Sequence, residues 1–359
     1  MIADPLADFL SQLGRSSVQA SVLAAVIWLV CRLLGSHLAA RWRCRLWLLV
    51  IIRLALPFSL PSPVSIFNLF VAPQRLARPE GVTFWLPDEL SSQAVRWIEQ
   101  PWVCWTWLGV ASALLLRVII GWSWTVWLRY TARPLDSWEA WWLLNKCKEV
   151  LGLQTPVAIL ESSKIRSPCL LGFFHPRLVL PVGLVHELTP YQLRLVFLHE
   201  LAHLQRRDIA LNWLLAAVET LHWFNPLAWL VTRSLRAGRE EACDACALAD
   251  QPQAHRVYGE TLIKLLERVS SEMAPPASPA MASLLGDGQD DLEPLVHRMR
   301  AIATFRPGHR TWVVGFCTWL ALACIGLTDA EPRVSPEGTE VPVACHPLPP
   351  AGVPAVVVG

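Results

Sequence analysis

The chain has 359 residues, of which 53% are apolar and 17% charged, and its mean hydropathy is +0.38. A sequence this apolar is typical neither of a disordered chain nor of an ordinary water-soluble domain. The net charge of +2, from 31 Lys and Arg against 29 Asp and Glu, excludes a protein that coats nucleic acid, because it supplies no strong basic field. The 19 Trp suit the boundary between lipid and water, so the composition indicates a membrane protein.

Four apolar runs are predicted to cross a membrane: residues 18–34, 46–60, 102–128 and 311–327. The second is short and contains Arg53 and Pro57, so it is either a distorted span or an interfacial segment. Because Arg53 and Arg117 are costly in lipid, we expect both to face the protein interior or to reach towards the interface. The first run lacks the basic start and cleavage pattern of a removable signal peptide, so we expect it to be retained.

The orientation of the spans follows from the basic residues of the short loops. The link between the first two runs carries three Arg and no acid, so we place it in the cytoplasm. Alternation then puts residues 129–310 inside, and the N-terminus, residues 61–101 and the tail 328–359 outside. The sequence thus predicts a multi-pass protein of the cell (inner) membrane, with three spans within residues 1–128, a cytoplasmic domain, a fourth span and a short flexible outer tail.

The strongest motif is the run His-Glu-Leu-Ala-His at residues 199–203. A helix is predicted to begin just before it, with Thr189 as N-cap, Pro190 at the first position and Gln192 completing a capping box. A spacing of four residues puts both imidazoles on one helical face, where they can bind a single zinc ion while Glu200 contacts a water there. The alternative is a helix whose two histidines only cap or line a polar core.

A catalytic zinc site needs a third protein ligand, and a later helix offers one. It presents Glu240 and Asp244 one turn apart, so both can face the same site. Glu240 is the predicted third ligand beside His199 and His203, and Asp244 would accept a hydrogen bond from a ligand histidine. Glu241 is the alternative ligand, one residue off that face. The other interpretation of the two glutamates is a solvated acidic pair that balances nearby arginines.

Several further side chains are interpreted as structural. The ten cysteines form no disulfide framework, and we expect them to be reduced. Cys243 and Cys246 form a Cys-x-x-Cys pair, but their helical setting without a second pair favours packing over a redox or zinc site. Asp208 can accept from a ligand histidine or pair with Arg207, and we favour the pairing. We interpret His222 as a core or interfacial residue because its surroundings are apolar.

Four ordered segments together resemble a known family. They are residues 167–181 (SPCLLGFFHPRLVLP), the 199–203 motif with the following Arg-Arg-Asp, residues 223–229 (WFNPLAW) and residues 240–244 (EEACD). In this order they are similar to the BlaR/MecR-type integral-membrane zinc metallopeptidases, peptidase family M-56, a family of β-lactam sensor-transducers. The resemblance spans roughly residues 18–327.

The resemblance implies an α-helical membrane protein with an α+β, gluzincin-like zincin domain inserted between the third and fourth spans. It implies that His199, His203 and Glu240 bind one zinc ion and that Glu200 is the general base, in agreement with the chemistry of these residues. It also implies hydrolysis of a protein substrate at the cytoplasmic face, in signal transduction or regulated proteolysis, for example of a transcriptional repressor. We expect no direct contact with nucleic acid. The sequence leaves open whether the protein forms a homodimer.

Residues 169–180 are predicted to form a β-hairpin, with apolar residues on both sides of His175-Pro176. In zincins of this kind the strand that leads towards the zinc helix has an open edge. We therefore expect Leu178, Val179 and Leu180 to bind an extended peptide substrate as an added strand. The alternative is a hairpin that only packs in the core.

The chain departs from the sensor-transducers after the last span, where they carry a penicillin-binding domain. Here residues 328–359 lack the Ser-x-x-Lys and Lys-Thr-Gly patterns of such a domain, so we expect no direct β-lactam sensing. A non-catalytic membrane signalling or scaffolding protein would lose the site residues, which are all present. A membrane zincin of the prenyl-protease or heat-shock type would lack the Phe-Asn-Pro segment and the single final span.

A fifth crossing at residues 209–230 would put Glu240 and His203 on opposite sides of the membrane, so we expect packed helices there.

Overall fold

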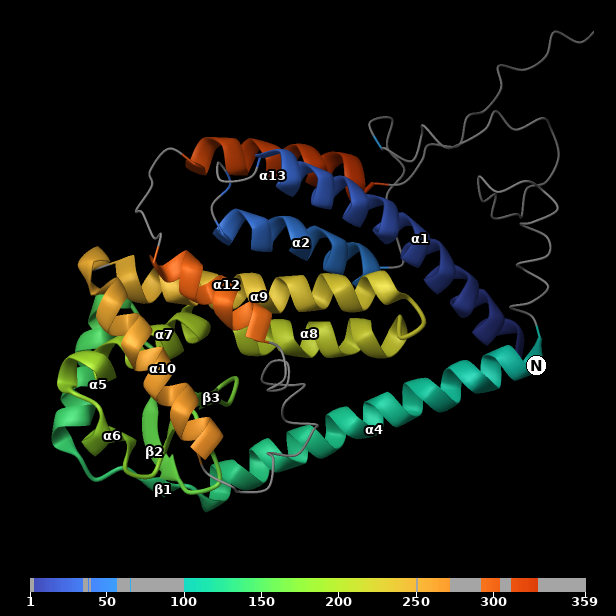
Figure 1. Ribbon diagram of the computed structural model, residues 1–359. Coiled ribbons are helices and arrows are strands. Elements are labelled where there is room, and N and C mark those ends of the chain that lie inside the picture. Colours follow the sequence, from blue (N-terminus) through green and yellow to red (C-terminus); the bar gives the residue numbers. More distant parts are fainter. Residues whose placement is uncertain are drawn as a thin grey trace, which may run out of the picture.

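The computed structural model describes residues 3–34, 38, 40–56, 65, 100–249, 251–271, 292–303 and 311–328. This part of the chain is mostly helical and contains one small sheet (Figure 1). The helices are α1 (Ala3–Leu34), α2 (Ala40–Ala55), α4 (Pro101–Thr131), α5 (Trp138–Leu151), α6 (Leu184–Glu187), α7 (Pro190–Gln205), α8 (Asp208–Leu221), α9 (Pro226–Ala249), α10 (His255–Ser271), α12 (Leu292–Ala303) and α13 (Thr311–Gly326). The strands are β1 (Arg133–Pro134), β2 (Ala158–Ser162), β3 (Cys169–Leu171) and β4 (Arg177–Pro181).

Two of the described helices are long and apolar enough to cross a membrane, α1 over Pro5–Leu34 and α4 over Pro101–Thr131. They coincide with the first and third expected spans. Only 11% of the most apolar stretch of α4 is buried by the described residues, as expected for a helix that faces lipid. The second and fourth expected spans coincide with the shorter helices α2 and α13, and the count of four spans therefore stays a prediction.

Helix α2 differs from the expected second span in where it begins and ends. It starts at Ala40 instead of residue 46, because Arg is a good helix former and the basic link continues the helix. Residues 57–60 of that span lie outside the described residues. Figure 1 shows α2 between α1 and α13 on one side and α8 and α9 on the other. Arg53 is buried and donates to Gln19 of α1, so it faces the protein interior as expected.

The apolar run at residues 209–230 is divided between two helices, α8 and α9, which lie side by side after a tight turn (Figure 1). Asn225 stabilises the turn, because its Oδ1 accepts a hydrogen bond of 2.9 Å from the backbone N–H of Leu227. No continuous fifth crossing is present in this described region. His222 is fully buried here, with Nδ1 2.7 Å from Ser17 Oγ and Nε2 3.0 Å from the carbonyl of Leu54, so it is a core residue.

The sheet has the strand order β1-β2-β4-β3, with β2 and β4 parallel and the other pairs antiparallel. The predicted hairpin at residues 169–180 is confirmed as the β3–β4 pair. However, β4 lies inside the sheet, because β2 pairs with it on the side away from β3. The expectation that Leu178, Val179 and Leu180 form an open edge is therefore wrong, and the outer strand on this side is β3.

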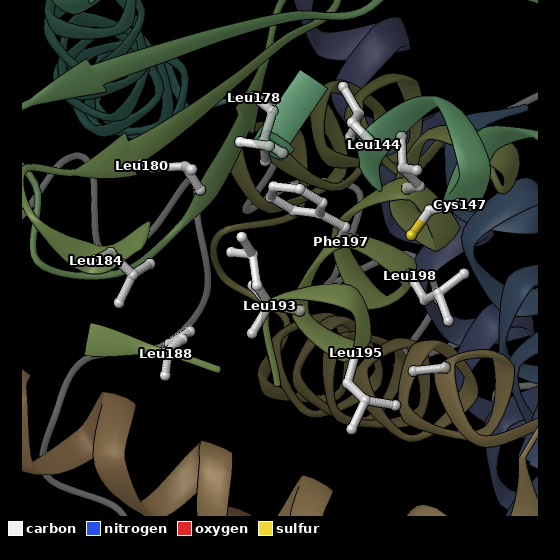
Figure 2. Packing of buried hydrophobic residues seen from close by; sticks show 14 of the residues in the cluster. Leu144, Cys147, Leu178, Leu180, Leu184, Leu188, Leu193, Leu195, Phe197 and Leu198 are labelled. Atoms are coloured by element: carbon white, nitrogen blue, oxygen red, sulfur yellow. The ribbon is translucent and has the colours of Figure 1, made fainter. Parts of the chain in front are cut away.

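Apolar side chains anchor α7 between the sheet and α5 (Figure 2). Successive residues of β4 point to opposite faces, so Leu178 joins Phe197 of α7 and Leu144 of α5 while Val179 packs near Leu128 of α4. Burial of each such side chain stabilises the fold by roughly 1.5–3 kcal/mol. This packing uses one side of α7 and leaves another for polar groups.

Candidate metal centre

Helix α7 begins as predicted, and its start sets the position of the two histidines. Thr189 Oγ1 accepts from the backbone N–H of Gln192 at 3.3 Å, and Gln192 Oε1 accepts from the backbone N–H of Thr189 at 3.1 Å. This capping box is complete and Pro190 occupies the first turn. His199 and His203 then lie one turn apart, with ring centroids separated by 5.0 Å.

Glu240 of α9 brings a carboxylate to the two rings. Its Oε2 lies 3.5 Å from Nε2 of His199, and its Oε1 lies 3.7 Å from Nε2 of His203. Each of the three residues offers one ligand atom, and these atoms all lie within 4.8 Å of one another. Two donors bound to a tetrahedral zinc at about 2.0–2.1 Å lie about 3.3 Å apart. The donor types and the two distances from Glu240 therefore fit a zinc ion.

The other ring nitrogen of His199 is held by a buried polar network. Its Nδ1 lies 3.1 Å from Oδ1 of Asp244 and 2.9 Å from the hydroxyl of Tyr258, which donates to the same Asp244 oxygen at 2.6 Å. Arg298 of α12 donates two hydrogen bonds of 2.9 Å to the Asp244 carboxylate. With Nδ1 engaged in this way, Nε2 is directed at Glu240, where a metal can replace its proton.

His203 is held by a different group. Its Nδ1 lies 2.7 Å from Oδ2 of Asp208, which is buried. The interpretation of Asp208 as a partner of Arg207 is therefore wrong. The reason is the backbone of Arg207, whose φ of 58° turns the chain sharply between α7 and α8 and brings Asp208 over the ring. The thiol of Cys243 lies 3.4 Å from the same ring nitrogen.

His203, Asp208 and Cys243 form a second group whose ligand atoms lie within 4.8 Å of one another. However, the 2.7 Å between His203 Nδ1 and Asp208 Oδ2 is a hydrogen-bond distance and is shorter than the separation of about 3.3 Å expected for two donors on one zinc. We therefore place the candidate metal on the Nε2 side. Cys243 and Cys246 are both free thiols, and Cys246 lies near Gln205 instead.

Glu241 lies on a neighbouring face of α9. Its Oε2 accepts a hydrogen bond of 2.6 Å from Arg43 of α2, which turns the carboxylate away from the histidines. Arg236 and Arg239 of α9 contact α8, since Arg236 pairs with Glu219 at 2.9 Å and Arg239 donates to Asn212 at 2.5 Å. The geometry thus supports neither Glu241 as a ligand nor a solvated acidic pair.

The carboxylates and imidazoles of the site shift one another's pKa. Burial lowers the pKa of His199, but the hydrogen bonds and charges of Asp244 and Glu240 outweigh it and raise the pKa to about 10. Burial raises the pKa of Glu240, but the hydrogen bond with His199 and the charges of His203 and Arg298 hold it well below its usual range. The site is therefore built to stabilise positive charge, which a divalent metal supplies in place of a proton.

Glu200 lies on α7 between the two histidines and is partly exposed. Burial raises the pKa of the Cys169 thiol in β3, and the negative charge of Glu200 adds to this effect. Glu200 therefore lies close enough to β3, which α7 contacts, for its charge to act on Cys169. Motif spacing identified the three converging residues and Asp244, whereas Tyr258 and Arg298 were missed because no local pattern links their helices to α7.

Comparisons with known proteins agree with this arrangement. A family model described as BlaR1 peptidase M56 matches residues 11–286. The regulatory protein BlaR1 of Bacillus licheniformis is 31% identical over 136 residues, which are 37% of this chain and 22% of that protein. The methicillin resistance mecR1 protein of Staphylococcus aureus is 28% identical over 109 residues, which are 30% of this chain and 19% of that protein. The matches thus cover about a fifth of each relative. Because the family model spans most of the chain, including α7 and α9, the chain belongs to the M56 peptidase family.

Proposed function

We propose that the protein is a zinc-dependent membrane endopeptidase that hydrolyses a peptide bond of a protein substrate at the cytoplasmic face. The observation that carries the proposal is the convergence of Nε2 of His199 and Nε2 of His203 on Glu240, while a carboxylate holds each Nδ1. Carboxylate–histidine pairs are typical of zinc sites, and three protein ligands leave a fourth position for water or substrate.

The chemistry divides between the metal and Glu200. A zinc ion bound by the three side chains would lower the pKa of a water molecule and polarise the scissile carbonyl. The Glu200 carboxylate accepts the proton of the attacking water and later donates it to the leaving amine. This set, with two histidines and a glutamate from a second helix, is the gluzincin-like arrangement that the resemblance implies.

The outer strand β3 supports a place for the substrate. The backbone groups on its outer side do not pair with β4. The negative charge of Glu200 also acts on the thiol of Cys169 in this strand. An extended peptide that adds to β3 would run beside the zinc helix with its carbonyl groups near Glu200. The substrate strand is thus assigned to residues 169–171 in place of residues 178–180.

Two observations support the cytoplasmic side and a signalling role. The positive-inside rule predicts that the basic start of α2 is cytoplasmic, and Arg43 in this part of α2 contacts Glu241, next to Glu240. The relatives are named as a regulatory protein and a methicillin resistance protein, so a regulated cleavage, for example of a transcriptional repressor, is the proposed role.

Proteolysis and metal content of the detergent-purified chain test the proposal together. The wild type should bind one zinc and cleave members of a library of cytoplasmic peptides, and Glu200→Gln should keep the zinc but lose cleavage. Glu241→Gln is the matched control and should keep both. A wild type without zinc, or a Glu200→Gln variant that still cleaves, would overturn the proposal.

A further inference from the structure

We propose that Arg298 is a positioning residue of the metal centre. In this account the guanidinium group, supplied by α12, holds the carboxylates of Glu240 and Asp244 in the arrangement in which His199 can bind zinc. The inference rests on the proposed function, because it concerns the same zinc ion. It adds a residue that lies beyond the segment matched by the family model.

The contacts of Arg298 reach both acidic residues. Its Nε donates to Oδ2 of Asp244 and its Nη2 to Oδ1, each at 2.9 Å, and its Nη1 lies 3.4 Å from Oε2 of Glu240. Two parallel hydrogen bonds fix the plane of a carboxylate as well as its distance. The side chain of Asp244 is only 4% exposed, so solvent screens these bonds little.

The first consequence concerns the role of Asp244. Its Oδ1 accepts from the Tyr258 hydroxyl and lies beside Nδ1 of His199, and Arg298 donates one hydrogen bond to each of its two oxygens. A carboxylate held in this way cannot rotate towards the metal and compete as a ligand. It stays an acceptor for the ring, which keeps Nε2 of His199 directed at Glu240.

The second consequence concerns charge. Glu240 and Asp244 are four residues apart on α9, where like charges repel each other. Arg298 contacts both, so its charge offsets this repulsion within the site. Without it, the two carboxylates would move apart and Glu240 would leave the position opposite the histidines.

The contacts of Arg298 with Asp244 and Glu240 require α12 to be docked against α9. α12 packs against α9 and α10 and is followed along the chain by the apolar helix α13 (Figure 1). The polar network around His199 is therefore complete only when α12 is docked. Zinc affinity should report on that docking, even though α12 supplies no metal ligand.

The test is the zinc affinity of the purified full chain in detergent, measured by competition with a chromogenic chelator. Arg298→Gln should lower the affinity by about 10- to 100-fold, the range typical of groups that orient a ligand. Arg298→Lys should lose less zinc affinity than Arg298→Gln, because lysine keeps the positive charge although it lacks the planar guanidinium group. Arg300→Ala, on the exposed side of the same helix, is the matched control and should bind zinc as the wild type does.

A double-mutant cycle separates positioning from general stability. If Arg298 acts through Asp244, the loss in zinc affinity for Arg298→Gln with Asp244→Asn should be smaller than the sum of the two single losses. Additive losses, or wild-type affinity in Arg298→Gln, would overturn the inference while zinc binding by the wild type upholds the proposed function. If Arg298→Gln does not fold, Arg298→Lys carries the same test. A wild type that binds no zinc would overturn the proposed function and the inference with it.

Discussion

The two candidate zinc histidines differ in where their hydrogen-bond partners lie in the sequence. His203 is held by Asp208, which lies five residues later at the start of α8. His199 is held by Asp244 of α9, Tyr258 of α10 and, through them, by α12. We call His203 with Asp208 the His203 half of the site, and His199 with Asp244, Tyr258 and Arg298 the His199 half. The His203 half needs only the turn between two consecutive helices, whereas the His199 half needs helices from later in the sequence to dock. Each half can be perturbed by itself.

The largest expected effect comes from Glu240, which contacts both halves. Glu240→Gln removes a charged ligand and should reduce zinc affinity by more than the roughly 10- to 100-fold of an outer residue. Zinc retained after dialysis, measured by mass spectrometry, checks this. Glu241→Gln should retain the metal because Glu241 points to Arg43. Loss of zinc in Glu241→Gln but not in Glu240→Gln would reverse the assignment.

The next effect separates the halves. Asp244→Asn and Asp208→Asn should each weaken zinc binding by about 10- to 100-fold, because each loses the acceptor that orients a ring. Asp244→Asn should also destabilise the metal-free fold by about 3 kcal/mol, because it removes the carboxylate that accepts two hydrogen bonds from Arg298. Thermal unfolding of the metal-free variants measures the difference. Equal melting temperatures for the two variants would count against the distinction between the halves.

Acid should weaken the His199 half through Asp244. Burial raises the pKa of this carboxyl, but hydrogen bonds from His199 and Arg298 outweigh it and lower the pKa from 3.8 to about 2. Its stabilising contribution, about 2 kcal/mol, is present above pH 3.8 and is lost as the pH falls towards 2. The difference in stability between wild type and Asp244→Asn, measured by unfolding in detergent from pH 5 to pH 2, should shrink over this window. A constant difference would contradict the cause given for the pKa.

The smallest effect is expected for Cys243 in the His203 half. Burial raises the pKa of its thiol, and the charges of Asp208 and Glu240 add to this, so it stays a neutral, weak hydrogen-bonding group. Cys243→Ala should weaken zinc binding by only about twofold, equivalent to about 0.5 kcal/mol. A loss as large as that of Asp208→Asn, in the same chelator competition, would indicate that the thiol itself holds the metal.

The parts of the site that sequence could predict are those set by helix periodicity. The capping box at Thr189 and the four-residue spacings of His199 with His203 and of Glu240 with Asp244 depend on local geometry alone. Each recurs in the structure on the expected helix.

The parts that sequence could not predict depend on tertiary contacts or on one backbone angle. Asp208 reaches His203 only because Arg207 adopts a positive φ, which its residue type does not favour. β4 is interior only because β2 pairs with it in parallel, a long-range choice without a local signal. Arg298 joins the site by the docking of α12, which no spacing in the chain encodes.

The most direct test of the central claim is the X-ray absorption spectrum of zinc bound to the purified full chain. The account predicts only nitrogen and oxygen neighbours at about 2.0–2.1 Å, from two imidazoles, Glu240 and one exchangeable ligand. A sulfur neighbour at about 2.3 Å would place the metal on the Nδ1 side of His203 with Cys243 and Asp208, and would contradict the assignment.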